Sequence, residues 1–120
     1  VHPSVVRNTF RIFTDDRVVL ISDSMRATGM PDGEYTLGGQ NVTVKGALAT
    51  LHDGTIAGSA TNLYDCMMNA VSMGIPLESA IKAATINPAK SIGIDNIVGS
   101  IEPGKRADIL CMGDCPRVVK

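Results

Sequence analysis

The chain has 120 residues, of which 44% are hydrophobic and 19% are charged, and its formal net charge is −1. This composition is typical of one modest globular domain and excludes an extensively disordered chain. The small net charge gives no indication of a nucleic-acid partner or of binding to a membrane surface, and no apolar run approaches the ~20 residues that span a bilayer. Since the first residues show no signal-peptide pattern, we expect a cytoplasmic protein.

The first elements predicted are a helix and a strand. Pro3 can begin a helix, and the two aspartates at 15 and 16 end it. The continuous apolar run within residues 17–22 predicts a strand that is covered on both faces, as in a parallel sheet flanked by helices. A polar residue directly after such a strand faces the mouth where ligands bind. Asp23 occupies this position, and it is either a functional carboxylate or an ordinary loop cap.

The middle of the chain departs from this rhythm. Three short strands are predicted at residues 35–37, 42–44 and 48–51, separated by glycines, and they form a small β insertion. A turn at residues 52–54 follows, and Ser59 is expected to cap a helix over residues 60–73, with Gly74 as its stop. A second helix is predicted from Pro76 and a short helical turn over residues 88–92. Short strands are predicted at 97–98, 99–101 and 107–112, around a turn at 102–105.

Several of these segments together resemble one known enzyme family. The matching segments are Ile-Ser-Asp-Ser-Met (residues 21–25), the glycine-containing stretches 29–39 and 53–59, Ala-Thr-Ile-Asn-Pro-Ala (84–89), and the stretch 99–108. The chain resembles the C-terminal third of N-acetylglucosamine-6-phosphate deacetylase, of the amidohydrolase superfamily. The resemblance implies an α/β fold. Residues 1–95 would be the C-terminal part of a (β/α)8 barrel with a small β insertion, and residues 96–120 the C-terminal strands of an accessory small β-domain.

The resemblance also implies an activity and site residues. The whole enzyme would hydrolyse the N-acetyl amide of N-acetylglucosamine 6-phosphate to glucosamine 6-phosphate and acetate. Asp23 would take the proton from a metal-bound water and pass it to the departing nitrogen, as a positioned carboxylate can. The residues Ile56, Ala57 and Gly58 would contact the sugar. Backbone amides at a helix start attract acceptor groups and Gly58 permits close approach, although a routine helix cap explains the same residues.

The metal ligands are expected outside this chain. A catalytic metal site usually takes three ligands, mostly His and carboxylates, whereas the sequence has only His2 and His52. The family implies a divalent metal, zinc or iron, and a homodimer. We therefore expect the chain alone to bind no catalytic metal and to be inactive. His2 is interpreted as an ordinary loop or helix-start residue, His52 as an exposed turn residue, and Lys105 and Arg106 as parts of a turn.

The three cysteines at 66, 111 and 115 do not form a disulfide framework, and buried thiols are the interpretation. Two other functions remain open. The chain could belong to an amidohydrolase acting on a different N-acyl sugar or on a cyclic amide. It could also be a non-catalytic, truncated or self-assembling chain.

Overall fold

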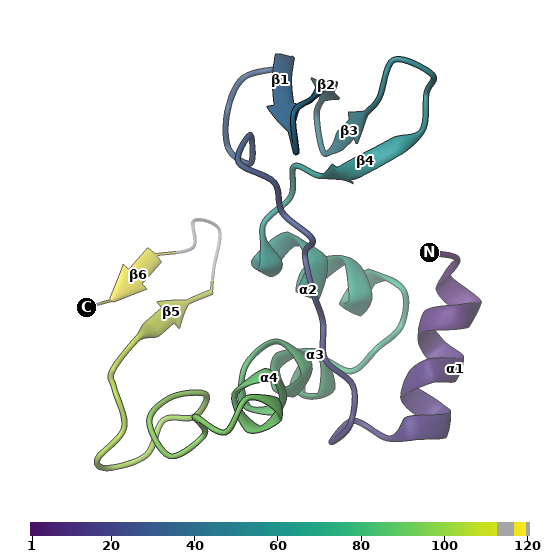
Figure 1. Ribbon diagram of the computed structural model, residues 1–120. Helices are drawn as coiled ribbons and strands as arrows, with labels where there is room; N and C mark the ends of the chain where they lie inside the picture. The colour runs from purple at the N-terminus through teal and green to yellow at the C-terminus, as the bar shows by residue number, and fades with distance from the viewer. Residues whose placement is uncertain (113–116, 120) are drawn as a thin grey trace. The chain divides into compact units, whose positions relative to one another are not determined.

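The computed structural model describes residues 1–112 and 117–119, and the chain folds as two compact units (Figure 1). One unit comprises Leu20–Asn69, and the other combines Val1–Val19 with Ala70–Lys120. The helices are α1 (Pro3–Phe13), α2 (Leu63–Ser72), α3 (Leu77–Ala84) and α4 (Ile86–Ser91). The strands are β1 (Gly33–Leu37), β2 (Gln40–Lys45), β3 (Leu48–Thr50), β4 (Ile56–Ser59), β5 (Ile109–Cys111) and β6 (Arg117–Val119). The fold is thus mixed α/β, as the sequence predicts.

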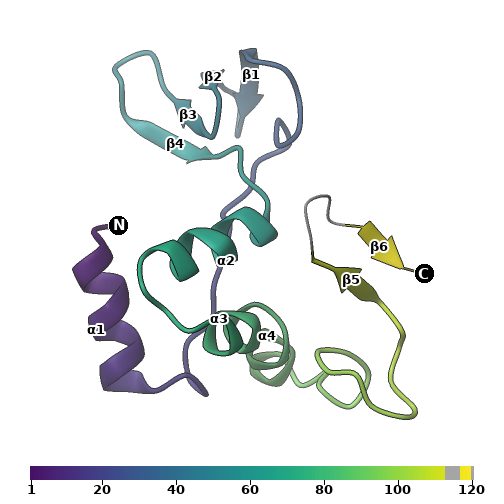
Figure 2. The same ribbon diagram turned by 180° about the vertical axis from the view of Figure 1, so that it is seen from behind.

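The unit of residues 20–69 is built on a four-stranded antiparallel sheet with the order β1-β2-β3-β4 (Figure 2). The tight turn between β1 and β2 consists of Gly38 and Gly39, whose φ angles are 57° and 83°. Two consecutive positive φ angles are required by the two-residue hairpin turn that matches the twist of paired strands. The three short strands predicted within residues 35–51 are confirmed.

The core of this unit lies under one face of the sheet. Val42 and Val44 alternate with Thr43 along β2, and each of the two valines is only 1% exposed. Successive side chains of a strand point to opposite faces, so both valines project to the same side. They pack with Met25, Ala27 and Ala49. The core therefore includes residues that directly follow Asp23 in the sequence.

The other unit contains α1, α3, α4 and the pair β5-β6. Arg7 in α1 donates a hydrogen bond of 2.9 Å to the Met73 carbonyl. The loop after α1 is held by α3, because the Asp15 carboxylate accepts from Ser79 Oγ and from Lys82 Nζ, each at 3.1 Å. Pro76 precedes α3, and Gly74 has a φ of 96°, as the predicted helix stop and start require.

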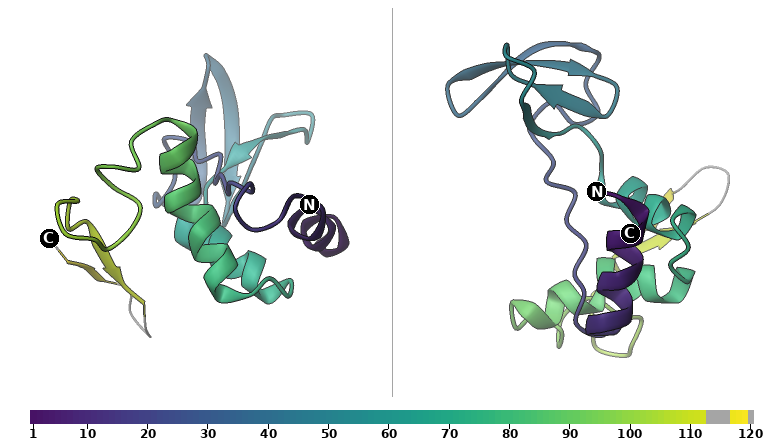
Figure 3. Two further views of the ribbon diagram at one scale, coloured as in Figure 1. Left: turned by 90° about the horizontal axis from the view of Figure 1, so that it is seen from below. Right: turned by 90° about the vertical axis from the view of Figure 1, so that its right-hand side faces the viewer.

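The strand predicted at residues 17–22 is not formed within the described residues. The chain after α1 is extended (Figure 3), but within the described residues it pairs with no strand, apart from a single parallel bridge between Ser24 and Ser59. A strand is defined by hydrogen bonds to its neighbours, so an apolar run alone cannot form one. The Ile21 side chain is 77% exposed, although an apolar side chain of this kind is typical of a strand that is covered on both faces.

Three smaller predictions are corrected. The helix expected from residue 60 begins at Leu63, and its cap is Asn62, whose Oδ1 accepts from the Asp65 amide at 2.9 Å. Ser59 belongs to β4. Residues 97–101 form turns, because Ile97 and Val98 both donate backbone hydrogen bonds to the Ile94 carbonyl.

The cysteines differ in burial, and the C-terminal strands β5 and β6 form a pair. Of the two described cysteines, Cys66 is half-buried and Cys111 is exposed, both as free thiols, so the expected burial is wrong for Cys111. Cys115 lies outside the described residues. Within the predicted strand 107–112, residues Ile109–Cys111 form β5, which pairs with β6. The division at residues 95 and 96 into a barrel part and a small β-domain stays a prediction.

Candidate active site

Asp23 lies at the end of the extended segment, in an unusual backbone conformation. Its φ angle is 52°, in the left-handed region that residues with a side chain seldom occupy, although Asp and Asn do so more often than most. The Asp23 carbonyl accepts a hydrogen bond of 3.1 Å from the Ser59 amide. The Met25 amide donates one of 2.9 Å to the Ser59 carbonyl. These two bonds fix the backbone of Asp23 against the end of β4.

The three residues expected to contact a sugar form most of β4, which is an edge strand of the sheet. Gly58 lies close to the backbone of Asp23, since a Cβ atom at Gly58 would lie 3.8 Å from the Asp23 carbonyl oxygen. Ala57 packs against the core of the sheet. Ile56 is 69% exposed at the start of the strand. The structure therefore brings Gly58 and Asp23 together and leaves Ile56 open to solvent.

This arrangement corrects the physical argument made for residues 56–58. They pair with β3 and do not form the start of a helix, because α2 begins at Leu63. The dipole of a helix N-terminus therefore does not act on them. In the strand, the absence of a side chain at Gly58 still permits a sugar to approach the backbone closely. The assignment of Ile56, Ala57 and Gly58 as sugar contacts stays a prediction.

The Asp23 carboxylate itself is exposed, and within the described residues it forms no hydrogen bond and no ion pair. A carboxylate that is free of partners can accept a proton from a bound water and return it. Sequence reasoning missed the groups beside it. The hydroxyls of Ser22 and Ser24 are 2.7 Å apart, and Ser24 Oγ also lies 2.5 Å from the Thr61 carbonyl oxygen. The only sequence signal was a serine on each side of Asp23.

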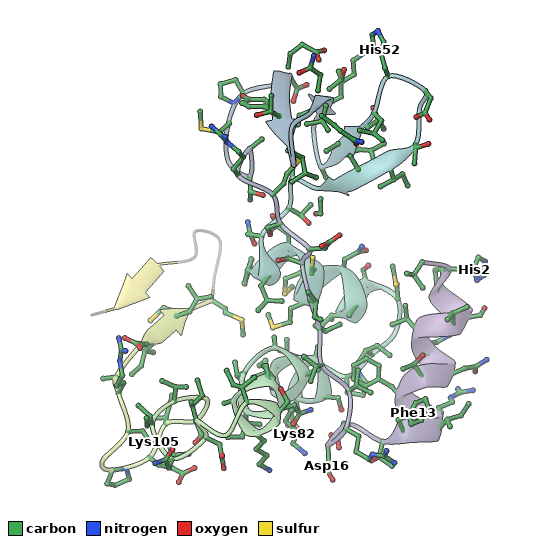
Figure 4. All side chains as sticks on the ribbon, in the orientation of Figure 1. His2, Phe13, Asp16, His52, Lys82 and Lys105 are labelled. Carbon is green, nitrogen blue, oxygen red and sulfur yellow. The ribbon has the colours of Figure 1, made fainter. Side chains whose placement is uncertain are left out.

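The two histidines lie in a helix cap and in a loop. His2 caps α1, where its Nδ1 accepts a hydrogen bond of 3.2 Å from the Ser4 amide, and His52 is exposed in the β3-β4 loop (Figure 4). Across residues 1–112, no group of three His, Cys, Asp or Glu side chains could hold a metal ion. The described residues thus do not fit a catalytic metal.

The basic turn near the C-terminus is structural. Lys105 donates to Ser100 Oγ at 2.5 Å and to Glu102 at 3.3 Å, and its side chain is only 12% exposed. The Ser100 hydroxyl and the Lys105 ammonium hold the pKa of Glu102 below its usual range. Arg106 pairs with Asp108 at 3.1 Å. These cations have partners within the turn, as the sequence interpretation expects.

Comparison with known proteins places this chain in a family. Residues 15–119 match the model of the amidohydrolase family. The chain belongs to the amidohydrolase family. No helix among the described residues is long and apolar enough to cross a membrane.

Within this family the chain is similar to deacetylases of amino-sugar phosphates. It is 40% identical over 98 residues to N-acetylgalactosamine-6-phosphate deacetylase of Escherichia coli O157:H7, which covers 81% of this chain and 26% of that protein. It is 39% identical over 113 residues to N-acetylglucosamine-6-phosphate deacetylase of Vibrio furnissii, covering 93% of this chain and 28% of that protein. The resemblance to the deacetylases is thereby confirmed.

Solved structures of amidohydrolases agree. The crystal structure of N-acetylglucosamine-6-phosphate deacetylase from Pasteurella multocida matches with a TM-score of 0.89 at 28% identity, over 98% of this chain and 31% of that one. The enzyme from Mycobacterium smegmatis matches with a TM-score of 0.86 at 32% identity, over 99% of this chain and 32% of that one. The chain spans 59% of one curated relative and between 23% and 29% of others.

Proposed function

We propose that this chain is part of an amidohydrolase that hydrolyses the N-acetyl amide of N-acetylglucosamine 6-phosphate, giving glucosamine 6-phosphate and acetate. The observation that carries the proposal is Asp23, which is exposed and whose backbone carbonyl lies beside Gly58, in a chain that matches such deacetylases over nearly its whole length. A structure of the Mycobacterium smegmatis enzyme in complex with N-acetyl-D-glucosamine-6-phosphate matches with a TM-score of 0.81.

The proposed chemistry uses Asp23 as a proton shuttle. A water molecule attacks the carbonyl carbon of the acetamide, and the Asp23 carboxylate takes the proton that the water loses. The bond between carbon and nitrogen then breaks, and Asp23 returns this proton to the departing nitrogen. The strand residues Ile56, Ala57 and Gly58 contact the sugar and orient the amide toward Asp23. The reaction depends on a divalent metal whose ligands lie outside this chain, and the chain alone is inactive.

The proposal extends to the architecture. The extended segment at residues 17–22 is a strand of a (β/α)8 barrel, whose neighbouring strands are supplied by other parts of the enzyme. The exposed Ile21 side chain supports this assignment, because such a strand is covered on both faces. The enzyme acts as a homodimer.

The experiment is an assay of acetate release by the purified enzyme that contains this chain. We expect turnover of N-acetylglucosamine 6-phosphate, loss of turnover after chelation, and its return when a divalent metal is added back. The unphosphorylated sugar is the control, and we expect it to react far more slowly. Failure to deacetylate any sugar phosphate would refute the proposal.

A second candidate substrate is N-acetylgalactosamine 6-phosphate. It is favoured by the 40% identity to the Escherichia coli O157:H7 enzyme of that name. The two sugars are epimers, so the amide chemistry is the same and only the sugar contacts differ. Measuring kcat/KM for both in one assay separates them. A preference of about tenfold or more for the galactosamine epimer would replace the first substrate by the second.

A further inference from the structure

We infer that Ser24 is a positioning residue that holds Asp23 in its left-handed conformation through a hydroxyl network of Ser22, Ser24, Ser59 and Thr61. The inference rests on the proposed function insofar as it concerns catalysis by Asp23. Its structural part stands on the hydrogen bonds alone. All four network residues, and Asp23 itself, lie in the unit of residues 20–69.

The direction of the hydrogen bonds follows from the groups involved. Ser24 Oγ lies 2.5 Å from the Thr61 carbonyl oxygen and 2.7 Å from Ser22 Oγ. A carbonyl can only accept, and a hydroxyl has one hydrogen to donate. Ser24 Oγ therefore donates to the Thr61 carbonyl, and it lies within hydrogen-bond distance of Ser22 Oγ. The side chains of Ser22 and Ser24, on the two sides of Asp23, are thus linked to each other and to Thr61, which lies two residues after the end of β4.

The acceptor at Thr61 is itself fixed. The Thr61 amide donates to Ser59 Oγ at 3.0 Å, and the two hydroxyls of Ser59 and Thr61 are 2.6 Å apart. Thr61 Oγ1 also lies 3.4 Å from the Cys66 sulfur at the first turns of α2. The network therefore ends on a segment that is itself hydrogen-bonded to the end of β4, so a bond from Ser24 to this segment restrains the backbone at Asp23.

The restraint is needed because of the φ angle at Asp23. A left-handed conformation at a residue with a side chain persists only where the surroundings over-determine it. The two backbone bonds to Ser59 hold the peptides before and after Ser24. The Ser24 hydroxyl adds a third hydrogen bond, which it donates to the Thr61 carbonyl in the segment that follows β4. Without it, Asp23 can relax toward an ordinary φ and its carboxylate moves away from the productive position.

The test uses the full-length enzyme with three variants. Ser24→Ala removes the donor, and Ser24→Thr keeps a hydroxyl at an exposed position that can take one more methyl group. The matched control is Ser91→Ala, because Ser91 Oγ also donates to a backbone carbonyl, that of Pro88 at 2.8 Å, in the other unit. Crystal structures give the φ of Asp23, steady-state kinetics give kcat and KM, and thermal melting reports on folding.

We expect φ of Asp23 to leave the left-handed region in Ser24→Ala and to stay there in Ser24→Thr and Ser91→Ala. We expect kcat of Ser24→Ala to fall about 10- to 100-fold with KM nearly unchanged, because misplacing a catalytic group by about 1 Å costs this much. Ser24→Thr should restore most of the loss. A merely structural role would lower the melting temperature and leave kcat of the folded fraction unchanged.

Three results would overturn the inference. The first is an unchanged φ of Asp23 in Ser24→Ala. The second is an unchanged kcat in Ser24→Ala while Asp23→Asn abolishes turnover. The third is a rise in KM alone in Ser24→Ala, which would make Ser24 a sugar contact. If the unmodified enzyme turns over neither sugar phosphate, the proposed function fails, and the φ angle in the crystal structures still decides whether Ser24 holds Asp23.

Discussion

The side-chain amide of Asn87 donates a hydrogen bond of 2.8 Å to the backbone carbonyl of Val18. The same nitrogen donates another, of 2.6 Å, to the Asp15 carbonyl. Asn87 lies in α4 and is only 5% exposed, so these carbonyls depend on it for their partners. The Asn-Pro motif of the sequence thus has a structural role: it fastens the segment between α1 and the extended run to α4.

Replacing Asn87 should therefore destabilise the protein strongly. Asn87→Ala leaves the two carbonyls without their donor, and Asn87→Asp substitutes a carboxylate that can only accept. We expect each variant to lose about 2 to 4 kcal/mol of unfolding free energy, measured by chemical denaturation. The exposed Asn96→Ala is the control and should change it by less than about 0.5 kcal/mol. Equal effects of Asn87→Ala and Asn96→Ala would contradict the assigned role.

The ion pair between Asp15 and Lys82 makes the free energy of unfolding depend on pH in the acidic range. The Lys82 ammonium, at 3.1 Å, and the Ser79 hydroxyl hold the pKa of the Asp15 carboxyl below its ordinary value of 3.8. The ionised form is thus favoured by folding. The stabilisation is present above about pH 3.8 and is lost as the pH falls through the lower pKa of the folded state.

Asp15→Asn tests this dependence. The melting temperature of the unmodified protein should fall more steeply than that of the variant as the pH goes from about 6 to about 2. Asp95→Asn is the control, because the ion pairs of the described residues do not include Asp95. Parallel curves for Asp15→Asn and the unmodified protein would show that the pair contributes nothing.

Gly99 is required by both conformation and space. Its φ is 96°, and a Cβ atom there would lie 3.0 Å from Ala89 Cβ and 3.0 Å from Ile86 Cα. Gly99→Ala should therefore destabilise the protein by about 2 to 4 kcal/mol, since backbone strain and overpacking add. Gly104 has a similar φ of 92° but open space around it. Gly104→Ala isolates the strain and should cost about 1 kcal/mol, so equal losses in the two variants would argue against the close packing at Gly99.

Turns, which are local features of the fold, could be predicted from the sequence, whereas strands that depend on pairing with a distant segment could not. The glycines between the apolar stretches of residues 35–51 identify hairpins, because a turn is specified by the residues that form it. In β4, by contrast, the sequence Ile-Ala-Gly-Ser has little strand preference, and its structure comes from pairing with β3. The run at 17–22 forms no strand within the described residues for the converse reason, since strand propensity without neighbours forms no ladder.

The site shows the same division. Asp23 is predicted from its position after an apolar run together with the family resemblance, and Ile56, Ala57 and Gly58 are predicted from the family resemblance. The bonds that place Asp23 beside Gly58 pass through Ser59, 36 residues later in the sequence than Asp23, and no periodicity signals them. The left-handed φ of Asp23 and the hydroxyl network around Ser24 are likewise consequences of long-range contacts.

Asp23→Asn should lower kcat. The amide keeps the size of the carboxylate but cannot accept and return a proton, and Asn tolerates the left-handed backbone as well as Asp does. We expect kcat to fall by about 10²- to 10⁴-fold with KM little changed, measured on the full-length enzyme. Thermal melting is the control and should be nearly unchanged. Near-normal kcat in the folded variant would remove Asp23 from the proposed chemistry.

Gly58→Ala tests whether the strand backbone approaches the sugar. The added Cβ would lie 3.8 Å from the Asp23 carbonyl oxygen and from a methyl carbon of Leu37, which is ordinary contact, so the fold has room for it. A sugar lying against this strand would meet the new methyl group. We therefore expect KM to rise about three- to tenfold with kcat changed by less than about twofold, and Gly58→Val to raise KM further. Gly33→Ala in β1 is the matched control, since its Cβ would lie 3.9 Å from the Tyr35 ring in a strand with no proposed sugar contact. If Gly58→Ala and Gly33→Ala leave KM equally unchanged, the sugar does not approach β4 at Gly58, and the assignment of residues 56–58 is wrong at this position.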